Sequence, residues 1–93
     1  MRTIERSSAF KRDYKRVKAT PRHRNVDTLL TEVLQLLLDD QPLPANNRDH
    51  ALSGDWAGYR ECHLKPDLLL IYKKPNVEVL RLARLGSHSE LFR

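Results

Sequence analysis

Two different hydrophobic periods divide the chain into a helical first half and a strand-rich second half. Phe10, Tyr14 and Val17 recur at i, i+4 and i+7, which places them on one face of a helix. A wider apolar stripe follows, made of Val26, Leu29, Leu30, Val33, Leu34, Leu37 and Leu38. Pro21 separates the two patterns because proline does not fit inside a helix. The first half therefore predicts a helical hairpin.

The second half of the chain alternates as strands do. Residues 56–64 alternate, so Tyr59, Glu61 and His63 share one face. Residues 68–72 are a continuous apolar run, as expected of a central strand buried on both faces. Turns are predicted at 65–67 and 73–76, where prolines preset the backbone, and a further strand is predicted over 77–85.

The two ends of the chain complete the expected architecture. Residues 2–5 form a short first strand, and Ser87 with Glu90 has the spacing of a capping box, which predicts a short helix or turn over 88–92. The element order is β-α-α-β-β-β plus this terminal helix. The fold class is therefore α+β, a mostly antiparallel sheet with the helical hairpin packed against it. With 93 residues, the chain is expected to form one domain, 1–93.

Charge is distributed unevenly along the chain. The net charge is +5, but residues 1–24 hold nine Lys or Arg and only two acids. Such a cluster attracts a polyanion, such as RNA, or an acidic protein partner. A solvated helix face gives the same pattern, and charge alone does not separate these interpretations. His23 lies in this segment, and we expect it to be solvated.

Composition excludes several classes of protein. No apolar run approaches the roughly 20 residues that cross a bilayer, and residues 1–6 do not have the pattern of a signal peptide. Cys62 is the only cysteine, so neither an internal disulfide nor an all-cysteine metal site can form. We therefore expect a cytoplasmic protein with no membrane contact.

Three histidines and an aspartate in the second half could carry chemistry. His50, His63 and His88 lie near strand ends, and Asp67 follows His63 across a turn. Antiparallel neighbours lie about 4.8 Å apart, so a meander can bring these positions together. The same set could ligate Zn²⁺, but its spacings match no compact zinc motif. We therefore expect no metal and no cofactor.

These residue types suit RNA cleavage by transesterification. That reaction needs a base for the 2′-hydroxyl and an acid for the 5′-oxygen, and histidine serves both roles near neutral pH. Arg60 and Arg84, on the same strands, are candidates to stabilise the phosphate in the transition state. Phe92, next to the C-terminus, is expected either to stack on a base or to dock on the sheet edge. Trp56 and Tyr59 are expected to be packing residues.

The second half also resembles a known family. Residues 49–67, residues 70–72 and residues 84–92 resemble the motifs of the YafQ branch of the RelE toxin superfamily. The first strand and the helical hairpin match in order and length, so the resemblance covers nearly the whole chain. It implies a microbial RNase-like fold and a toxin that enters the ribosomal A site and cuts messenger RNA.

The resemblance also implies partners. They are an antitoxin with a ribbon-helix-helix end and a tail that wraps the toxin, the ribosome with its messenger RNA, and operator DNA bound only by the toxin–antitoxin complex. In this interpretation the basic segment binds ribosomal RNA or the acidic antitoxin tail.

The resemblance implies roles for six positions of this sequence. His88 is the general acid, and either Asp67 or His50 is the general base. His63 orients or stabilises the phosphate, and Phe92 holds a base of the codon. Arg60 is either structural or directed at the phosphate.

Two other functions remain open. One is a non-catalytic module that binds RNA or the ribosome, which needs the basic face but not the histidines. The other is a toxin directed at a protein such as gyrase, because gyrase-poisoning relatives share the fold without this histidine set.

Overall fold

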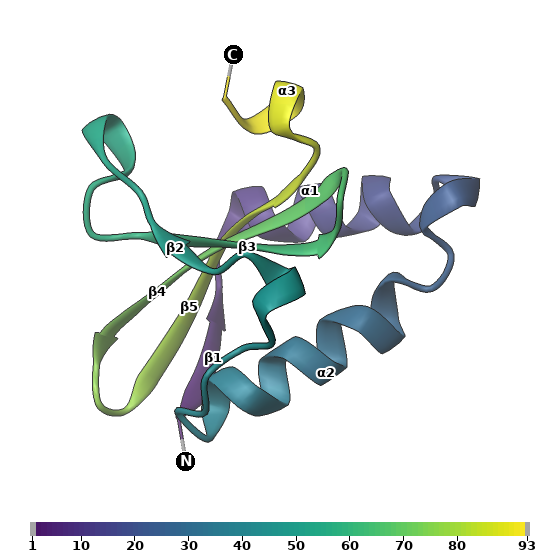
Figure 1. The fold of residues 1–93 in the computed structure, drawn as a ribbon. Coiled ribbons are helices and arrows are strands. Elements are labelled where there is room, and N and C mark those ends of the chain that lie inside the picture. The colour runs from purple at the N-terminus through teal and green to yellow at the C-terminus, as the bar shows by residue number, and fades with distance from the viewer. Residues whose placement is uncertain (1, 93) are drawn as a thin grey trace.

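The structure, a computed structural model, describes residues 2–92 (Figure 1). Its helices and strands are β1 (Thr3–Arg6), α1 (Ser8–Lys18), α2 (Val26–Leu38), β2 (His50–Ala51), β3 (Arg60–Lys65), β4 (Leu68–Asn76), β5 (Val79–Gly86) and α3 (His88–Leu91). Short 3₁₀ turns lie at Pro21–His23, Ala45–Asn47 and Gly54–Trp56.

The five strands form one sheet in the order β1-β5-β4-β3-β2. β1 runs parallel to β5, and the other pairs are antiparallel. The α1–α2 hairpin connects β1, at one edge of the sheet, to β2, at the other. The predicted α+β class, the mostly antiparallel sheet and the helical hairpin are confirmed.

The strands differ from the prediction in three places. β2 was not predicted, because its two residues are too few to show alternation. The strand expected over 56–64 begins only at Arg60, because Gly54 and Gly58 take positive φ values of 66° and 91° in the preceding loop. The turn expected at 73–76 lies at 77–78 instead, and β4 continues through Pro75. Proline is tolerated there because the pairing of β4 with β5 shifts register between Lys73 and Asn76.

The sheet buries its two faces against different partners. One face, with Leu70 and Leu82, packs against the apolar stripes of α1 and α2 and forms the main core. On the opposite face, Leu91 of α3 packs with Leu69, Ile71 and Ala83. Figure 1 shows α2 below the sheet and α3 above it. Trp56 and Tyr59 pack at the margin of the upper cluster, in an edge-to-face pair at 5.2 Å, as predicted.

Beyond the end of β1, side chains of α1 and of the preceding Ser7 form hydrogen bonds with the backbone of β5. Ser7 Oγ donates to the Ala83 carbonyl at 2.7 Å, and the Leu85 N–H donates to Asp13 Oδ2 at 3.0 Å. Arg16 Nη2 donates to the Leu85 carbonyl at 3.2 Å. Side chains of α1 therefore satisfy backbone groups that would otherwise be exposed along this edge.

The expectation that His23 is solvated was wrong. Its residue is only 5% exposed, in the loop between α1 and α2, and its Nδ1 lies 3.4 Å from Lys65 Nζ. Burial, followed by the charge of Lys65, lowers the pKa of His23. The sequence pattern missed this because the loop folds back onto β3. No helix within residues 2–92 is long and apolar enough to cross a membrane.

Candidate active site

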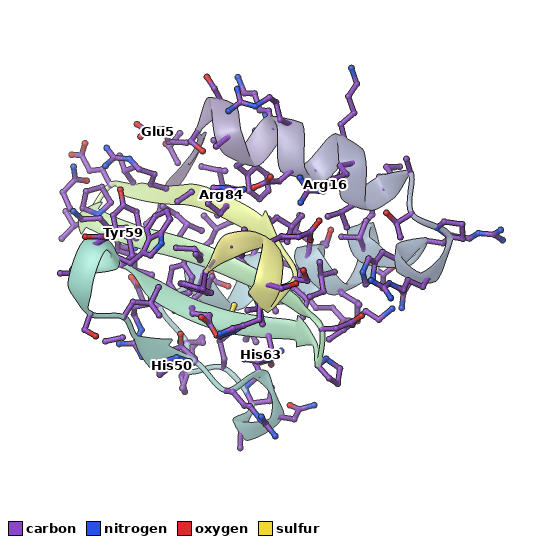
Figure 2. All side chains as sticks on the ribbon, turned by 90° about the horizontal axis from the view of Figure 1, so that it is seen from above. Glu5, Arg16, His50, Tyr59, His63 and Arg84 are labelled. Carbon is purple, nitrogen blue, oxygen red and sulfur yellow. The ribbon has the colours of Figure 1, made fainter. Side chains whose placement is uncertain are left out.

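A buried carboxylate joins two of the predicted histidines. Strand pairing places His50 of β2 directly opposite Glu61 of β3, and His63 lies two residues further along β3 on the same face. Glu61 Oε1 lies 3.2 Å from His63 Nε2 and 3.9 Å from His50 Nε2. Glu61 is 5% exposed, so this carboxylate has little water around it. Figure 2 shows the two histidines near the same margin of the sheet.

The backbone fixes the tautomer of His50. Its Nδ1 lies 2.8 Å from the Arg48 carbonyl oxygen, which can only accept a hydrogen bond. Nδ1 therefore carries the proton, and in the neutral ring Nε2 keeps its lone pair. Arg48 holds this carbonyl in place from a left-handed backbone conformation (φ 48°). The His50 side chain is 53% exposed, so the ring lies at the surface.

Sequence reasoning did not select Glu61. The alternation of residues 56–64 did place it on the same face as His63, and that arrangement is confirmed. The missing signal was the pairing of β2 with β3, since only that register brings His50 opposite the carboxylate. The feature that could have identified Glu61 is an acid on the same strand face as a histidine, next to the buried Cys62.

His88 and Phe92 lie on the same face of the sheet, carried by α3. Ser87 caps this helix and Glu90 completes the capping box, as predicted. The rings of His88 and Phe92 lie 4.9 Å apart. Leu91 anchors the helix on the apolar cluster beside β4 and β5. The structure thus places His88 above the sheet face that holds His50, Glu61 and His63.

Asp67 stands apart from these side chains. It lies in the predicted turn between β3 and β4, where its side chain is 49% exposed and its Oδ2 is 3.7 Å from Arg22 Nε. The described residues give it no hydrogen bond to His50, His63 or His88. The structure therefore does not bring Asp67 into direct contact with the histidines.

The two candidate arginines occupy opposite faces of the sheet. Arg84 pairs with Ile71, which pairs with Glu61, so all three lie in one row across the site face. Its guanidinium binds the Asp13 carboxylate through Nε at 2.6 Å and Nη2 at 3.2 Å. Arg60 lies on the other face, where Nε and Nη2 donate to Asp49 at 3.3 and 3.0 Å. The structure therefore brings Arg84, but not Arg60, onto the face of the histidines.

A pocket opens next to His63. Its volume is about 320 Å³, and Asn47, Arg48 and Lys65 line it together with His63. Asn47 Nδ2 donates to the His63 carbonyl at 2.7 Å, which ties the loop before β2 to β3. The cationic side chains of Arg48 and Lys65 thus border a pocket that is also lined by His63, which contacts the Glu61 carboxylate.

Neither the cysteine nor a metal cluster adds chemistry within the described part of the chain. Burial raises the pKa of the Cys62 thiol to about 12, so the thiol stays protonated and unreactive. No group of three or more His, Cys, Asp or Glu side chains among residues 2–92 is arranged to hold a metal ion.

Known proteins resemble the chain over its whole length. A family model described as bacterial toxin of type II toxin-antitoxin system, YafQ, matches residues 2–93. The mRNA interferase toxin YafQ of Escherichia coli K12 is 41% identical over 91 residues, 98% of this chain and 96% of the relative.

Solved structures extend the likeness to the fold. The crystal structure of the E. coli DinJ-YafQ complex superposes with a TM-score of 0.84 at 39% identity, covering 100% of each chain. A metal-bound toxin from Helicobacter pylori superposes with a TM-score of 0.84 at 45% identity, covering 99% of this chain and 100% of that one. The expected RelE-like fold is thereby confirmed, and the chain belongs to the YafQ family of bacterial type II toxin–antitoxin toxins.

Proposed function

We propose that this chain is the toxin of a type II toxin–antitoxin pair and an endoribonuclease that cuts messenger RNA in the ribosomal A site. The observation that carries the proposal is the cluster in which His50 and His63 both direct Nε2 toward the buried Glu61. The YafQ relative at 41% identity, named an mRNA interferase, supports the same activity.

His50 is the general base in this proposal. The 2′-hydroxyl oxygen attacks the adjacent phosphorus while His50 Nε2 accepts the hydroxyl proton. The Arg48 carbonyl holds Nδ1–H, so Nε2 is the nitrogen with a lone pair. This geometry favours His50 over Asp67, because the Asp67 carboxylate is paired with Arg22.

Glu61 supports the base electrostatically. When His50 takes the proton, the ring becomes a cation 3.9 Å from a carboxylate that is shielded from water. The Arg48 carbonyl orients the neutral imidazole through Nδ1, and the nearby carboxylate stabilises the imidazolium that forms. His63, 3.2 Å from the same oxygen, orients or stabilises the phosphate.

His88 is the general acid. It donates a proton to the 5′-oxygen as the bond between phosphorus and that oxygen breaks, leaving a 2′,3′-cyclic phosphate and a 5′-hydroxyl. Its ring is exposed at the start of α3, accessible to a substrate lying on the sheet face. Arg84 lies on the same face of the sheet, but its guanidinium is bound to Asp13 beside α1, so this proposal gives it a structural role. The chemistry uses side chains alone.

RNA binding uses the surroundings of the site. Phe92 stacks on a base of the codon, with its ring held 4.9 Å from that of His88. Arg48 and Lys65 border the pocket beside His63 and bind backbone phosphates. Asp67, which pairs with Arg22 in the turn after β3, takes no part in the proton transfers of this proposal.

The partners in this proposal are an antitoxin, the ribosome and its messenger RNA, and the protein acts in the cytoplasm. The structural relative solved as the DinJ-YafQ complex supports an antitoxin partner. The antitoxin supplies a ribbon-helix-helix domain, and operator DNA is bound only by the toxin–antitoxin complex.

The test compares the wild-type protein with His88→Ala after induction in bacteria, mapping messenger RNA 5′ ends with and without translation. We expect new ends within translated codons, and we expect both the substitution and a block of translation to remove them. General acid catalysis contributes about 10²–10⁴-fold, so residual cleavage should fall near the detection limit.

Other outcomes of this experiment would reject the proposal. Growth arrest without new 5′ ends in either protein would favour a gyrase-directed toxin. Growth arrest that persists in His88→Ala would favour a non-catalytic module that binds the ribosome.

A further inference from the structure

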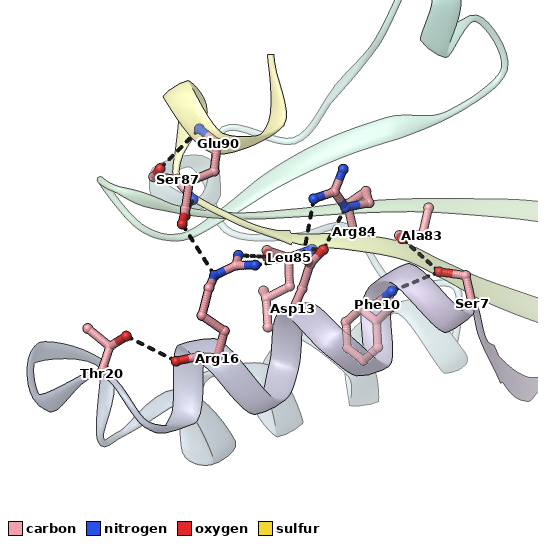
Figure 3. Close-up of polar contacts among 10 residues, drawn as sticks. All are labelled: Ser7, Phe10, Asp13, Arg16, Thr20, Ala83, Arg84, Leu85, Ser87 and Glu90. Carbon is pink, nitrogen blue, oxygen red and sulfur yellow. Dashed lines mark hydrogen bonds and ion pairs between the residues drawn. The ribbon is translucent and has the colours of Figure 1, made fainter. Parts of the chain in front are cut away.

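Helix α1 reaches across the end of β5 to hold the helix that carries His88. Arg16 Nε lies 3.3 Å from Glu90 Oε2, while Arg16 Nη1 donates to Asp13 Oδ1 at 3.0 Å. Its Nη2 donates to the Leu85 carbonyl at 3.2 Å. One guanidinium therefore contacts α1, β5 and α3 together, as Figure 3 shows.

Gly86 leaves space for this contact at the end of β5. A Cβ on Gly86 would lie 2.9 Å from Arg16 Nη2 and 3.0 Å from Glu90 Oε1. A larger residue would therefore force the ends of these two flexible side chains to shift by a few tenths of an ångström. The guanidinium and the carboxylate thus pack over the backbone where the chain passes from β5 into α3.

Asp13 fixes the position of the Arg16 guanidinium. The Asp13 residue is 3% exposed and accepts hydrogen bonds from Arg84, Arg16 and the Leu85 N–H. Burial alone would raise its pKa, but these hydrogen bonds outweigh burial and hold the pKa of Asp13 below its usual value. Asp13 is therefore ionised at neutral pH and draws Arg16 to the edge of β5.

Helix α3 depends on such contacts because it has only four residues, His88–Leu91. An isolated helix of this length is unstable in water, because the entropy lost in forming the first turn exceeds the free energy gained from its hydrogen bonds. Leu91 supplies its apolar anchor and Ser87 its cap. Glu90, which completes the capping box by accepting from the Ser87 N–H at 2.8 Å, is the same side chain that Arg16 binds.

We propose that Arg16 is a positioning residue for the cleavage reaction: through Glu90 it fixes α3 and thereby the place of His88 above the His50–Glu61–His63 cluster. This inference rests on the proposed role of His88. It also distinguishes Arg16 from three other basic residues of the same helix. Arg16 binds Asp13 and Glu90, whereas Lys11, Arg12 and Lys15 are exposed and form no ion pair within residues 2–92.

The experiment compares Arg16→Gln with Arg12→Gln, which removes the same charge from the same helix. Single-turnover cleavage on messenger-programmed ribosomes gives a saturating rate constant and a half-saturating toxin concentration. Hydrogen exchange in the free toxin is followed at the Leu91 and Phe92 amides, which close α3 by donating to Ser87 and His88 carbonyls. Exchange of the β3 and β4 amides reports on global stability.

We expect Arg16→Gln to lower the saturating rate constant by about 10–100-fold, because a displacement of about 1 Å at a reacting group costs that much. The half-saturating concentration should change no more in Arg16→Gln than in Arg12→Gln. Amides of α3 should exchange at least tenfold faster in Arg16→Gln while those of β3 and β4 do not change. Arg16→Lys should recover part of the rate, because its ammonium keeps the charge but not the fork.

Three results would overturn the inference. Unchanged exchange in α3 would show that Arg16 does not hold the helix. Faster exchange throughout the sheet would show that Arg16 has a general structural role. A change in the half-saturating toxin concentration alone, with an unchanged rate constant, would show that Arg16 contacts RNA. If the wild-type protein itself cleaves nothing, the proposed function fails, and exchange in the free toxin still decides whether Arg16 fixes α3.

Discussion

Two buried carboxylates, Asp13 and Glu61, lie at opposite margins of the same sheet and have different kinds of partner. Asp13 is 3% exposed and is bound by two arginines and a backbone N–H. Glu61 is 5% exposed and faces two histidines. Figure 2 shows Arg84 beside α1 and the two histidines at the far margin.

The difference lies in whether the partners can change their charge. Arginine stays protonated at every accessible pH, so the charge around Asp13 is constant and holds α1 against β5. Histidine gains and loses a proton near neutral pH, so the charge around Glu61 can change during a reaction. Equal burial therefore gives a fixed structural joint at one margin and a site for proton transfer at the other.

Replacing the structural carboxylate should have the largest effect on stability. Asp13→Asn leaves Arg84 and Arg16 partly buried beside a neutral amide, and breaking such a pair costs about 3 kcal/mol in the free energy of unfolding. Urea denaturation measures this loss directly. Unchanged stability in Asp13→Asn would mean that the contacts of α1 with the edge of β5 contribute little.

Acid should remove the same contribution. The folded-state pKa of Asp13 lies below its unfolded value, so its stabilisation is complete above the unfolded value and is lost as pH falls through the folded one. The difference in stability between wild type and Asp13→Asn should stay constant above about pH 5 and shrink below about pH 4. A difference that shrinks near pH 6 instead would point to a histidine.

Replacing the second carboxylate should affect the reaction more than the fold. Glu61→Gln leaves partners that can become neutral, so no charge is stranded and stability should change by less than about 1 kcal/mol. The imidazolium formed at His50 loses its counter-charge, and we expect the cleavage rate constant to fall about 10²-fold. Ribosome-programmed cleavage at saturating toxin measures it.

An exposed acid provides the control for Glu61. Glu32 lies on the surface of α2 with no recorded ion pair among the described residues, and Glu32→Gln should leave the rate unchanged. If Glu61→Gln cleaves as fast as this control, the carboxylate only packs the sheet. If it instead destabilises the protein as much as Asp13→Asn does, the contrast between the two margins is lost.

The sequence predicted one of these two margins better than the other. His50, His63 and His88 were selected because their residue type suits acid–base chemistry, and the alternation of residues 56–64 correctly placed Glu61 beside His63. The pairing of β2 with β3 could not be predicted, because a two-residue strand has no period to detect. Glu61 therefore remained one acid among many until the register was known.

The Asp13 joint was hidden for a different reason. Asp13 lies in a segment rich in Lys and Arg, where one acid looks like part of a solvated charged face. Its burial depends on Arg84 and Leu85, more than 70 positions away in the chain. Local periodicity carries no information about such contacts, and the same limit explains why His23 was expected to be solvated.

Asp49 is a third carboxylate, of intermediate burial, and we expect only a small loss of stability when one of its hydrogen-bond donors is removed. Its side chain is 25% exposed, and it accepts a hydrogen bond from the Tyr72 hydroxyl at 2.5 Å as well as two from Arg60. Tyr72→Phe removes one donor, but Arg60 and solvent still satisfy the carboxylate. We expect a loss of about 1 kcal/mol in urea denaturation and an unchanged cleavage rate, because Tyr72 packs in the core on the face opposite the histidines. A loss as large as that of Asp13→Asn would mean that the Tyr72 hydroxyl, rather than its charged partner Arg60, is the main stabilising contact of Asp49.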